Sequence, residues 1–256
     1  MKLHIIEGYI QNIHLAEYEH GCLLLDGCCR VDIDIIQHFF MNTLNRPISD
    51  LKLVVVTHMH PDHAGCALTL KKISGCKILS GRMTDSYFKT QWYAGIKGSI
   101  AHIVDMALAL WVANRLGKKK RNIWYPKYLS ADIYLSDNET IPGFEDWKIM
   151  HTPGHTDRDI SVYNENEKLI YVADLIVRVK QQLVPPFPVY LPNAYKNSLV
   201  KVKKFNEFRF LMAHVSPMRL AKSDIDAVIE RAPSTPKTNL NAVKNKIRRI
   251  YQLPKS

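Results

Sequence analysis

Residues 54–65 read Val54-Val55-Val56-Thr57-His58-Met59-His60-Pro61-Asp62-His63-Ala64-Gly65, and this stretch decides how the chain is interpreted. Three histidines and one aspartate follow a short apolar run. Imidazole and carboxylate groups are ligands of zinc and similar metals in proteins. A polar turn at a strand end is the alternative, but turns favour glycine, asparagine, aspartate and serine over histidine. The spacing therefore predicts a metal site built from His58, His60, Asp62 and His63.

This cluster lies between an expected strand and an expected helix. Residues 51–56 are almost continuously apolar, which is typical of a strand that is covered on both faces. Pro61 and Asp62 suit the first turn of a helix that would run to about Lys72, because proline lacks a donor and aspartate complements the positive end of the helix. The ligands are thus expected on a strand-to-helix loop, which is a common position for chemistry in α/β folds.

Other segments alternate between strand and helix signals. Residues 31–44 have helical spacing, and their apolar face is expected to hold Ile35, Ile36, Phe39 and Phe40. Strands are predicted at residues 21–25, 76–79, 132–135, 147–151, 160–163 and 169–172, with a hairpin turn at residues 164–167 and further helices at residues 198–210 and 223–231. Periodicity alone predicts a mixed α/β domain.

Three later stretches add ligand-type residues after apolar runs. They are Met150-His151-Thr152-Pro153-Gly154-His155-Thr156, Tyr171-Val172-Ala173-Asp174 and Leu211-Met212-Ala213-His214. Together with the first cluster they resemble the metal motifs of the metallo-β-lactamase superfamily, in the same order and over nearly the whole chain. Two positions depart from the family pattern, because Ala173 stands where a glycine is usual and Val215, not glycine, follows His214.

The resemblance implies both a fold and a two-metal centre. The implied fold class is α/β, a four-layer αββα metallo-β-lactamase sandwich with a helical insertion. Two zinc ions are the expected cofactors, with iron or manganese as alternatives. The implied ligands are His58, His60 and His155 for the first metal, Asp62, His63 and His214 for the second, and Asp174 as the bridge.

The expected chemistry is hydrolysis by a hydroxide that two metal ions share. Zinc lowers the pKa of bound water from 15.7 to about 7, so no serine or cysteine nucleophile is needed. Asp62 is the expected catalytic residue, which orients the nucleophile or accepts its proton. Thr57 and Thr156 either anchor ligating histidines by hydrogen bonds or only stabilise turns.

Composition is typical of one globular domain. The chain has 256 residues, 46% of them hydrophobic, which predicts a single domain over residues 1–256. The first residues have no sustained apolar run and no small-residue cleavage site, so a cytoplasmic location is expected. The five cysteines lack paired zinc-knuckle spacing, which favours reduced core thiols; they are Cys22, Cys28, Cys29, Cys66 and Cys76.

A net charge of +11 favours anionic partners without choosing among them. Lysines concentrate at residues 118–121, 196–204 and 237–255. No aromatic-interleaved RNA motif accompanies them, so a solvated basic surface is favoured over a nucleic-acid track. A small-molecule substrate is the expected partner, nucleic acid is the less favoured one, and no oligomeric state is predicted.

Residues 83–129 form an insertion that the implied fold does not require. Residues 99–116 are strongly apolar but too short and too polar to span a bilayer, which takes about 20 mainly apolar residues. The segment is interpreted as a helix buried in the domain, a lid over an apolar substrate pocket, or an interfacial helix whose Trp111 and following basic residues contact an acidic membrane. A lid is favoured, because long insertions often cover binding sites.

A shared metal centre does not identify the substrate. The superfamily includes β-lactamases, thioester hydrolases of the glyoxalase II type, lactonases and nucleic-acid phosphodiesterases. A small ester, lactone or thioester with an apolar tail agrees best with the insertion, and a phosphodiester is the alternative because of the positive charge. An iron-dependent oxidoreductase and a noncatalytic binding protein are the two other classes, and the complete ligand set favours a hydrolase over both.

Overall fold

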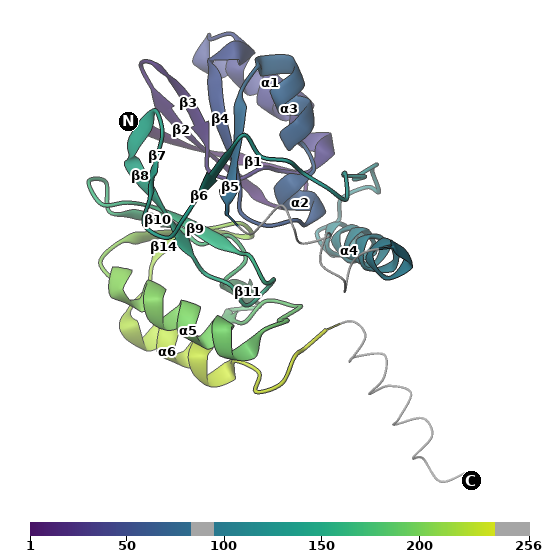
Figure 1. The fold of residues 1–256 in the computed structure, drawn as a ribbon, viewed down its shortest axis with the longest axis vertical. Coiled ribbons are helices and arrows are strands. Elements are labelled where there is room, and N and C mark those ends of the chain that lie inside the picture. Colours follow the sequence, from purple (N-terminus) through teal and green to yellow (C-terminus); the bar gives the residue numbers. More distant parts are fainter. Residues whose placement is uncertain (83–94, 239–256) are drawn as a thin grey trace.

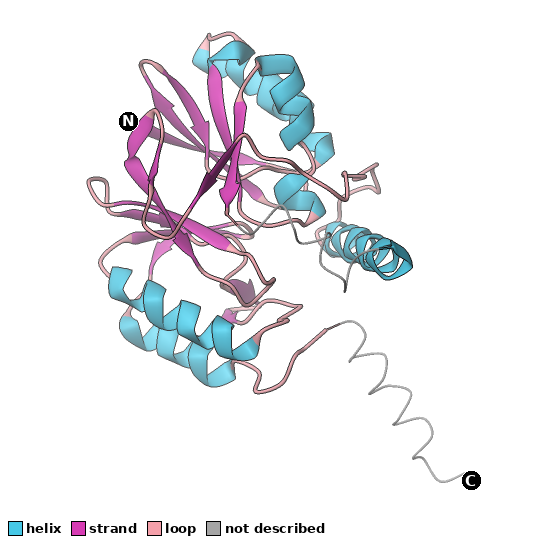
Figure 2. Cartoon of the chain, viewed as in Figure 1, coloured by secondary structure: helices cyan, strands magenta, loops and turns pink. Residues whose placement is uncertain are grey.

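The computed structural model describes residues 1–82 and 95–238. In this part of the chain, two six-stranded sheets face each other and helices cover their outer faces (Figures 1 and 2). The arrangement confirms the predicted four-layer αββα sandwich. Each sheet contains parallel and antiparallel neighbours.

The first sheet comes from the amino-terminal part of the chain. Its strands are β1 (Lys2–Glu7), β2 (Asn12–Tyr18), β3 (Gly21–Leu24), β4 (Leu51–Val56), β5 (Lys77–Gly81) and β6 (Ile133–Leu135), in this order across the sheet. The first three pair antiparallel, and β3 to β6 run parallel. Because β4 lies inside the parallel half, both of its faces are covered, which explains its continuous apolar sequence.

The second sheet contains β7 (Thr140–Ile141), β8 (Phe144–His151), β9 (Ile160–Asn164), β10 (Leu169–Tyr171), β13 (Arg209–Met212) and β14 (Val215–Arg219). Their order across the sheet is β14-β13-β10-β9-β8-β7, and only β10 and β13 pair in parallel. The antiparallel pairing of β9 and β10 confirms the turn predicted between them. A separate hairpin consists of β11 (Val177–Val179) and β12 (Gln182–Val184).

Helices flank the sandwich on both sides (Figure 1). On the first sheet lie α1 (Ile33–Phe39), α2 (Pro61–Ala64) and α3 (Ala67–Ser74), and on the second lie α5 (Pro192–Val202) and α6 (Lys222–Arg231). Short helical turns occupy Arg30–Asp32, Phe40–Leu44, Ile48–Asp50 and Lys203–Phe205.

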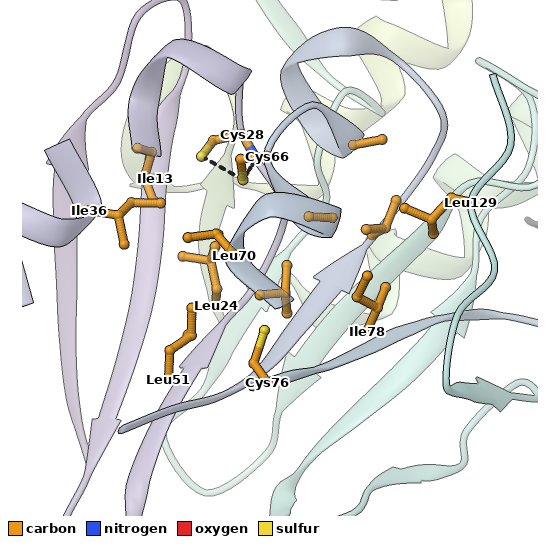
Figure 3. Packing of buried hydrophobic residues seen from close by; sticks show 14 of the residues in the cluster. Ile13, Leu24, Cys28, Ile36, Leu51, Cys66, Leu70, Cys76, Ile78 and Leu129 are labelled. Carbon is orange, nitrogen blue, oxygen red and sulfur yellow. Dashed lines mark hydrogen bonds between the residues drawn. The ribbon is translucent and has the colours of Figure 1, made fainter. Parts of the chain in front are cut away.

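Apolar side chains fill the spaces between the layers. Figure 3 shows the cluster beneath α1 and α3, where Ile36 and Leu70 pack toward the strand residue Leu24. Trp147 is fully buried between the two sheets, and Phe210 packs in the cluster beneath α5 and α6. All five cysteines are buried and free.

Two helix predictions were wrong in their bounds. The helix predicted at residues 198–210 begins earlier, because Pro192 occupies its first turn, and Arg209 already belongs to strand β13. The single helix predicted to about Lys72 is broken between Ala64 and Ala67. At this break the Cys66 N–H donates to the Cys28 carbonyl at 2.9 Å instead of continuing the helix.

The prediction for Ile35 was wrong, because its side chain is exposed, whereas those of Ile36 and Phe40 are buried.

The predicted insertion contains α4 (Gly95–Arg115), and residues 83–94 of it lie outside the described residues. Of the helices in the described ranges, none has the length and apolarity needed to cross a membrane. The lid interpretation and the single-domain assignment stay predictions.

Candidate metal centre

The structure brings all seven predicted ligands together at one edge of the sandwich. Four of them follow β4, two on the loop and two in α2, while the others follow three strands of the second sheet. Their donor atoms form two groups, each with all atoms within 4.8 Å of one another. The groups are His58, His60, His155 and Asp174, and Asp62, His63 and His214.

The first group is built around His60. Its Nδ1 atom lies 3.0 Å from His58 Nε2 and 3.1 Å from His155 Nε2. All three residues are buried. Three ring nitrogens that face one point are the donor arrangement that a tetrahedral zinc site requires.

Asp174 faces both groups. Its Oδ2 atom lies 3.6 Å from His155 Nε2, and its Oδ1 atom lies 3.5 Å from His63 Nε2 and 3.2 Å from His214 Nε2. In the second group Asp62 Oδ2 lies 3.6 Å from His63 Nε2 and 3.4 Å from His214 Nε2. One carboxylate can therefore contact ions in both groups.

The outer ring nitrogens of several ligands are held by oxygen atoms. His63 Nδ1 donates to Asp26 Oδ2 at 2.5 Å, and His155 Nδ1 donates to the Pro188 carbonyl at 2.7 Å. His214 Nδ1 donates to the Ile10 carbonyl at 2.8 Å. Since these partners are acceptors, each inner Nε2 keeps its lone pair for a metal ion.

Asp26 is one of three carboxylates at the site that sequence reasoning missed. Its carboxylate accepts hydrogen bonds from the His63 ring, the Thr57 N–H and hydroxyl, and the Tyr171 hydroxyl. The available signal was an aspartate two positions after the buried strand β3, which pairs with the strand that leads to the candidate ligands. The Thr57 hydroxyl also lies 3.1 Å from His58 Nδ1, which agrees with its expected role as an anchor of a histidine.

Thr156 has a turn role instead. Its hydroxyl donates to Asp159 Oδ1 at 2.7 Å, and its N–H donates to Asp159 Oδ2 at 2.7 Å. The Gly154 N–H also donates to Asp159, at 3.1 Å. Asp159, which was not predicted, thus orders the loop that carries His155.

A third unpredicted carboxylate reaches the site from the insertion. Asp105 on α4 is buried, and its Oδ1 atom lies 4.0 Å from His60 Nε2. Neither His60 Nε2 nor Asp105 Oδ2 has a hydrogen-bond partner. Burial, together with the nearby Asp62 carboxylate, raises the pKa of the Asp105 carboxyl to about 7.

Electrostatics favour the neutral forms of His58 and His60 and the ionised forms of Asp62 and Asp174. Burial, together with the nearby His155 and His63, lowers the pKa of His60 to about 3. Burial would also lower the pKa of His214, but the carboxylates of Asp174 and Asp62 raise it to about 10. Burial opposes ionisation of Asp62, yet His63 and His214 hold its pKa below the usual value.

The residues present suit divalent metal ions. His63 Nε2 and Asp174 Oδ1 are buried atoms without hydrogen-bond partners, and both point into the second group. The raised pKa values of His63 and His214 show that their surroundings favour positive charge, which a cation provides when it displaces the ring protons. Histidine nitrogens with carboxylate oxygens form a donor set for zinc or iron.

Ala173, one of the two positions that depart from the family pattern, has a left-handed backbone with φ of 47°. A glycine adopts this conformation without the steric cost that a Cβ atom adds. Asp174 follows Ala173, three positions after the end of β10. The chain thus keeps the backbone conformation for which glycine is suited while it carries alanine.

Gly154 has no room for a side chain. Its φ is +147°, and a Cβ atom would lie 2.3 Å from the Tyr195 Cα atom. We expect Gly154→Ala to lower the free energy of unfolding by about 2–3 kcal/mol and to displace His155, because the backbone must move. Urea denaturation and metal counting measure both effects.

Gly143→Ala is the matched control. Gly143 also has a positive φ, of +81°, but nothing lies within 4 Å of an added Cβ atom. Only the backbone cost of about 1 kcal/mol is expected, with unchanged metal content. Equal losses in both variants would show that the contact with Tyr195 does not matter.

Comparisons with known proteins agree with the motifs. Residues 6–214 match the family model described as the metallo-beta-lactamase superfamily. A hydroxyacylglutathione hydrolase from Francisella tularensis subsp. novicida is 23% identical over 203 residues, which cover 78% of this chain and 63% of that protein. The match thus spans less than two thirds of that relative's length.

Solved structures show the same fold at low sequence identity. A metallo-beta-lactamase family protein from Thermus thermophilus has a TM-score of 0.65 and 16% identity, covering 100% of this chain and 84% of that chain. A protein solved in a di-iron-bound form has a TM-score of 0.56 and 18% identity, covering 89% of this chain and 97% of that chain. With the family model matching most of its length, the chain belongs to the metallo-beta-lactamase superfamily.

Proposed function

We propose that this protein is a two-metal hydrolase that cleaves a small thioester, ester or lactone. The proposal rests on one observation. Seven donor groups lie in two clusters, and the Asp174 carboxylate lies next to histidines of both. Membership of the superfamily and the similarity to a hydrolase support a metal-dependent hydrolase. The name of that relative denotes hydrolysis of an acylglutathione, which supports a thioester.

The chain's residues have distinct roles in this proposal. His58, His60 and His155 would hold one ion, Asp62, His63 and His214 would hold the other, and Asp174 lies close enough to contribute to both. When bound, the metal ions supply an activated nucleophile at neutral pH and polarise the scissile carbonyl. Zinc is the favoured metal for this histidine-rich donor set, with iron as the alternative.

Asp62 is the group that we assign to proton transfer. Its carboxylate is held ionised by His63 and His214, so it accepts a proton from the attacking nucleophile. The side of the site next to His214 is the more open one, because the His214 side chain is 24% exposed whereas His58 and His155 are buried. The substrate carbonyl is thus expected to approach past His214.

A substrate panel with metal counting tests this proposal. We expect about two metal ions per chain and hydrolysis of an acyl thioester, with ester, lactone and phosphodiester substrates in the same panel. Asp62→Asn should lower kcat on the order of a hundredfold while the protein stays folded, because it removes a proton acceptor that acts in the transition state. One iron per chain with oxygen consumption would contradict hydrolysis, and selective phosphodiester cleavage would contradict the substrate class.

A further inference from the structure

Helix α4 has an apolar stripe on its outer face. The inner face is buried at four-residue spacing by Asp105, Ala109 and Ala113. The outer stripe repeats with the same spacing and consists of Ile103, Ala107 and Trp111, all exposed. A surface helix of a soluble domain normally turns polar residues outward, so the outer stripe is unexplained by the fold.

The segment that follows α4 adds exposed aromatic side chains, Trp124 and Tyr128. Ile123 is buried in the same cluster as Ala109 and Ala113, so the chain returns alongside the helix. Trp124 is 51% exposed there, as are Trp111 at 56% and Ile103 at 60%. We call the exposed residues Ile103, Ala107, Trp111, Leu116, Trp124 and Tyr128 the α4 surface.

Cationic side chains border the α4 surface. Arg115 lies over the Trp111 ring, with 5.2 Å between the guanidinium carbon and the ring centroid. Lys119, Lys120 and Arg121 follow directly and are exposed, while Lys118 forms an ion pair with Glu7. The surface therefore combines apolar and aromatic groups with a local excess of positive charge.

We propose that the α4 surface docks on the headgroup region of a lipid bilayer that contains anionic lipids. Tryptophan and tyrosine favour the membrane–water interface, and exposed basic residues are attracted to anionic headgroups. An interfacial helix needs an apolar face rather than a full membrane span, which agrees with the properties of α4. Charge complementarity thus selects an anionic bilayer as the partner.

A second copy of the chain is the rival occupant. In a two-fold symmetric dimer the same patch meets itself, which would place Lys119, Lys120 and Arg121 of both copies at the border of one interface. Such like charges repel one another unless anions separate them. The docking proposal concerns the outer face of α4 and is independent of the reaction proposed for the metal centre.

Vesicle flotation with the full chain tests the docking. We expect binding to phosphatidylcholine vesicles with about one third phosphatidylglycerol, weak binding to pure phosphatidylcholine, and release in high salt. Each lysine removed should lower the partition coefficient about fivefold, so the double variant Lys119→Gln/Lys120→Gln should lose on the order of twenty-five-fold. Trp111→Ala should lose about tenfold through the apolar contact.

Matched controls separate docking from general charge and stickiness. Lys204→Gln/Lys222→Gln removes the same charge from exposed positions elsewhere, and Met41→Ala removes an apolar side chain that is 66% exposed. Both should bind vesicles like the unmodified protein. Equal losses in the control and test variants, or no binding to anionic vesicles, would overturn the proposal. A dimer in sedimentation velocity that Trp111→Ala dissociates would assign the surface to self-association instead.

Discussion

His58→Ala is expected to abolish catalysis and to empty the first metal site. His58 Nε2 lies 3.0 Å from His60 Nδ1, so its removal leaves two imidazoles where a tetrahedral ion requires more ligands. Metal activation contributes several kcal/mol to the rate, and each 1.36 kcal/mol is about tenfold. We therefore expect kcat/KM to fall at least about a thousandfold and the metal content to fall from two ions per chain to one or fewer.

His151→Ala is the control for this change. His151 is the last residue of β8, just before the loop that carries His155. Its Nε2 atom lies 3.3 Å from the Leu135 carbonyl oxygen, and His151 belongs to neither ligand group. The control variant should keep its metal ions and its activity within about twofold. If His58→Ala kept two ions and full activity, the assignment of the first group as ligands would be wrong.

Asp26→Asn is expected to have the second-largest effect. Asp26 Oδ2 accepts from His63, Thr57 and Tyr171, and Oδ1 accepts from the Gly27 and Thr57 N–H groups. An asparagine must place its NH₂ group at one of these two positions, where it faces donors. Metal affinity of the second group should fall about 10–100-fold, and the free energy of unfolding should fall by about 3 kcal/mol.

Chelator competition and urea denaturation measure the two effects of Asp26→Asn. Tyr171→Phe serves as the comparison, because it removes a single donor to Asp26 and leaves the His63 contact in place. It should cost about 1 kcal/mol and leave metal affinity nearly unchanged. If the two variants behave alike, the carboxylate does not orient His63 and its role is only to fill space.

Local sequence signals predicted an element correctly where the burial of that element alone sets its pattern of apolar residues. The strand Leu51–Val56 was predicted with its observed bounds, because burial on both faces leaves a continuous apolar run. The helix Pro192–Val202 was predicted too far along the chain, at residues 198–210. Its lysine-rich end and the strand Arg209–Met212 both contain apolar residues, and the spacing of these residues does not separate the two elements. The strands β1 and β2 were not predicted at all.

The site was predictable to the extent that its donors lie in short motifs. His58, His60 and His63 share one loop and helix, so their types and spacing carried the inference. Asp26 and Asp105 could not be found in this way, because each meets its histidine only through the tertiary fold, 37 residues away for Asp26 and His63. Residues that orient ligands are set by sheet order rather than by local pattern.

The division of the donors between the two sheets has a consequence for hydrogen exchange. His58, His60, Asp62 and His63 belong to the first sheet and its helix, whereas His155, Asp174 and His214 extend from the second. Ions bound by both sets would link the two sheets at this edge. Elsewhere, apolar side chains such as Trp147 fill the space between the sheets. Amide protons near the carboxyl ends of β4 and β10 should therefore exchange more slowly when metal is bound. Amide protons at the amino ends of the same strands should show a smaller change.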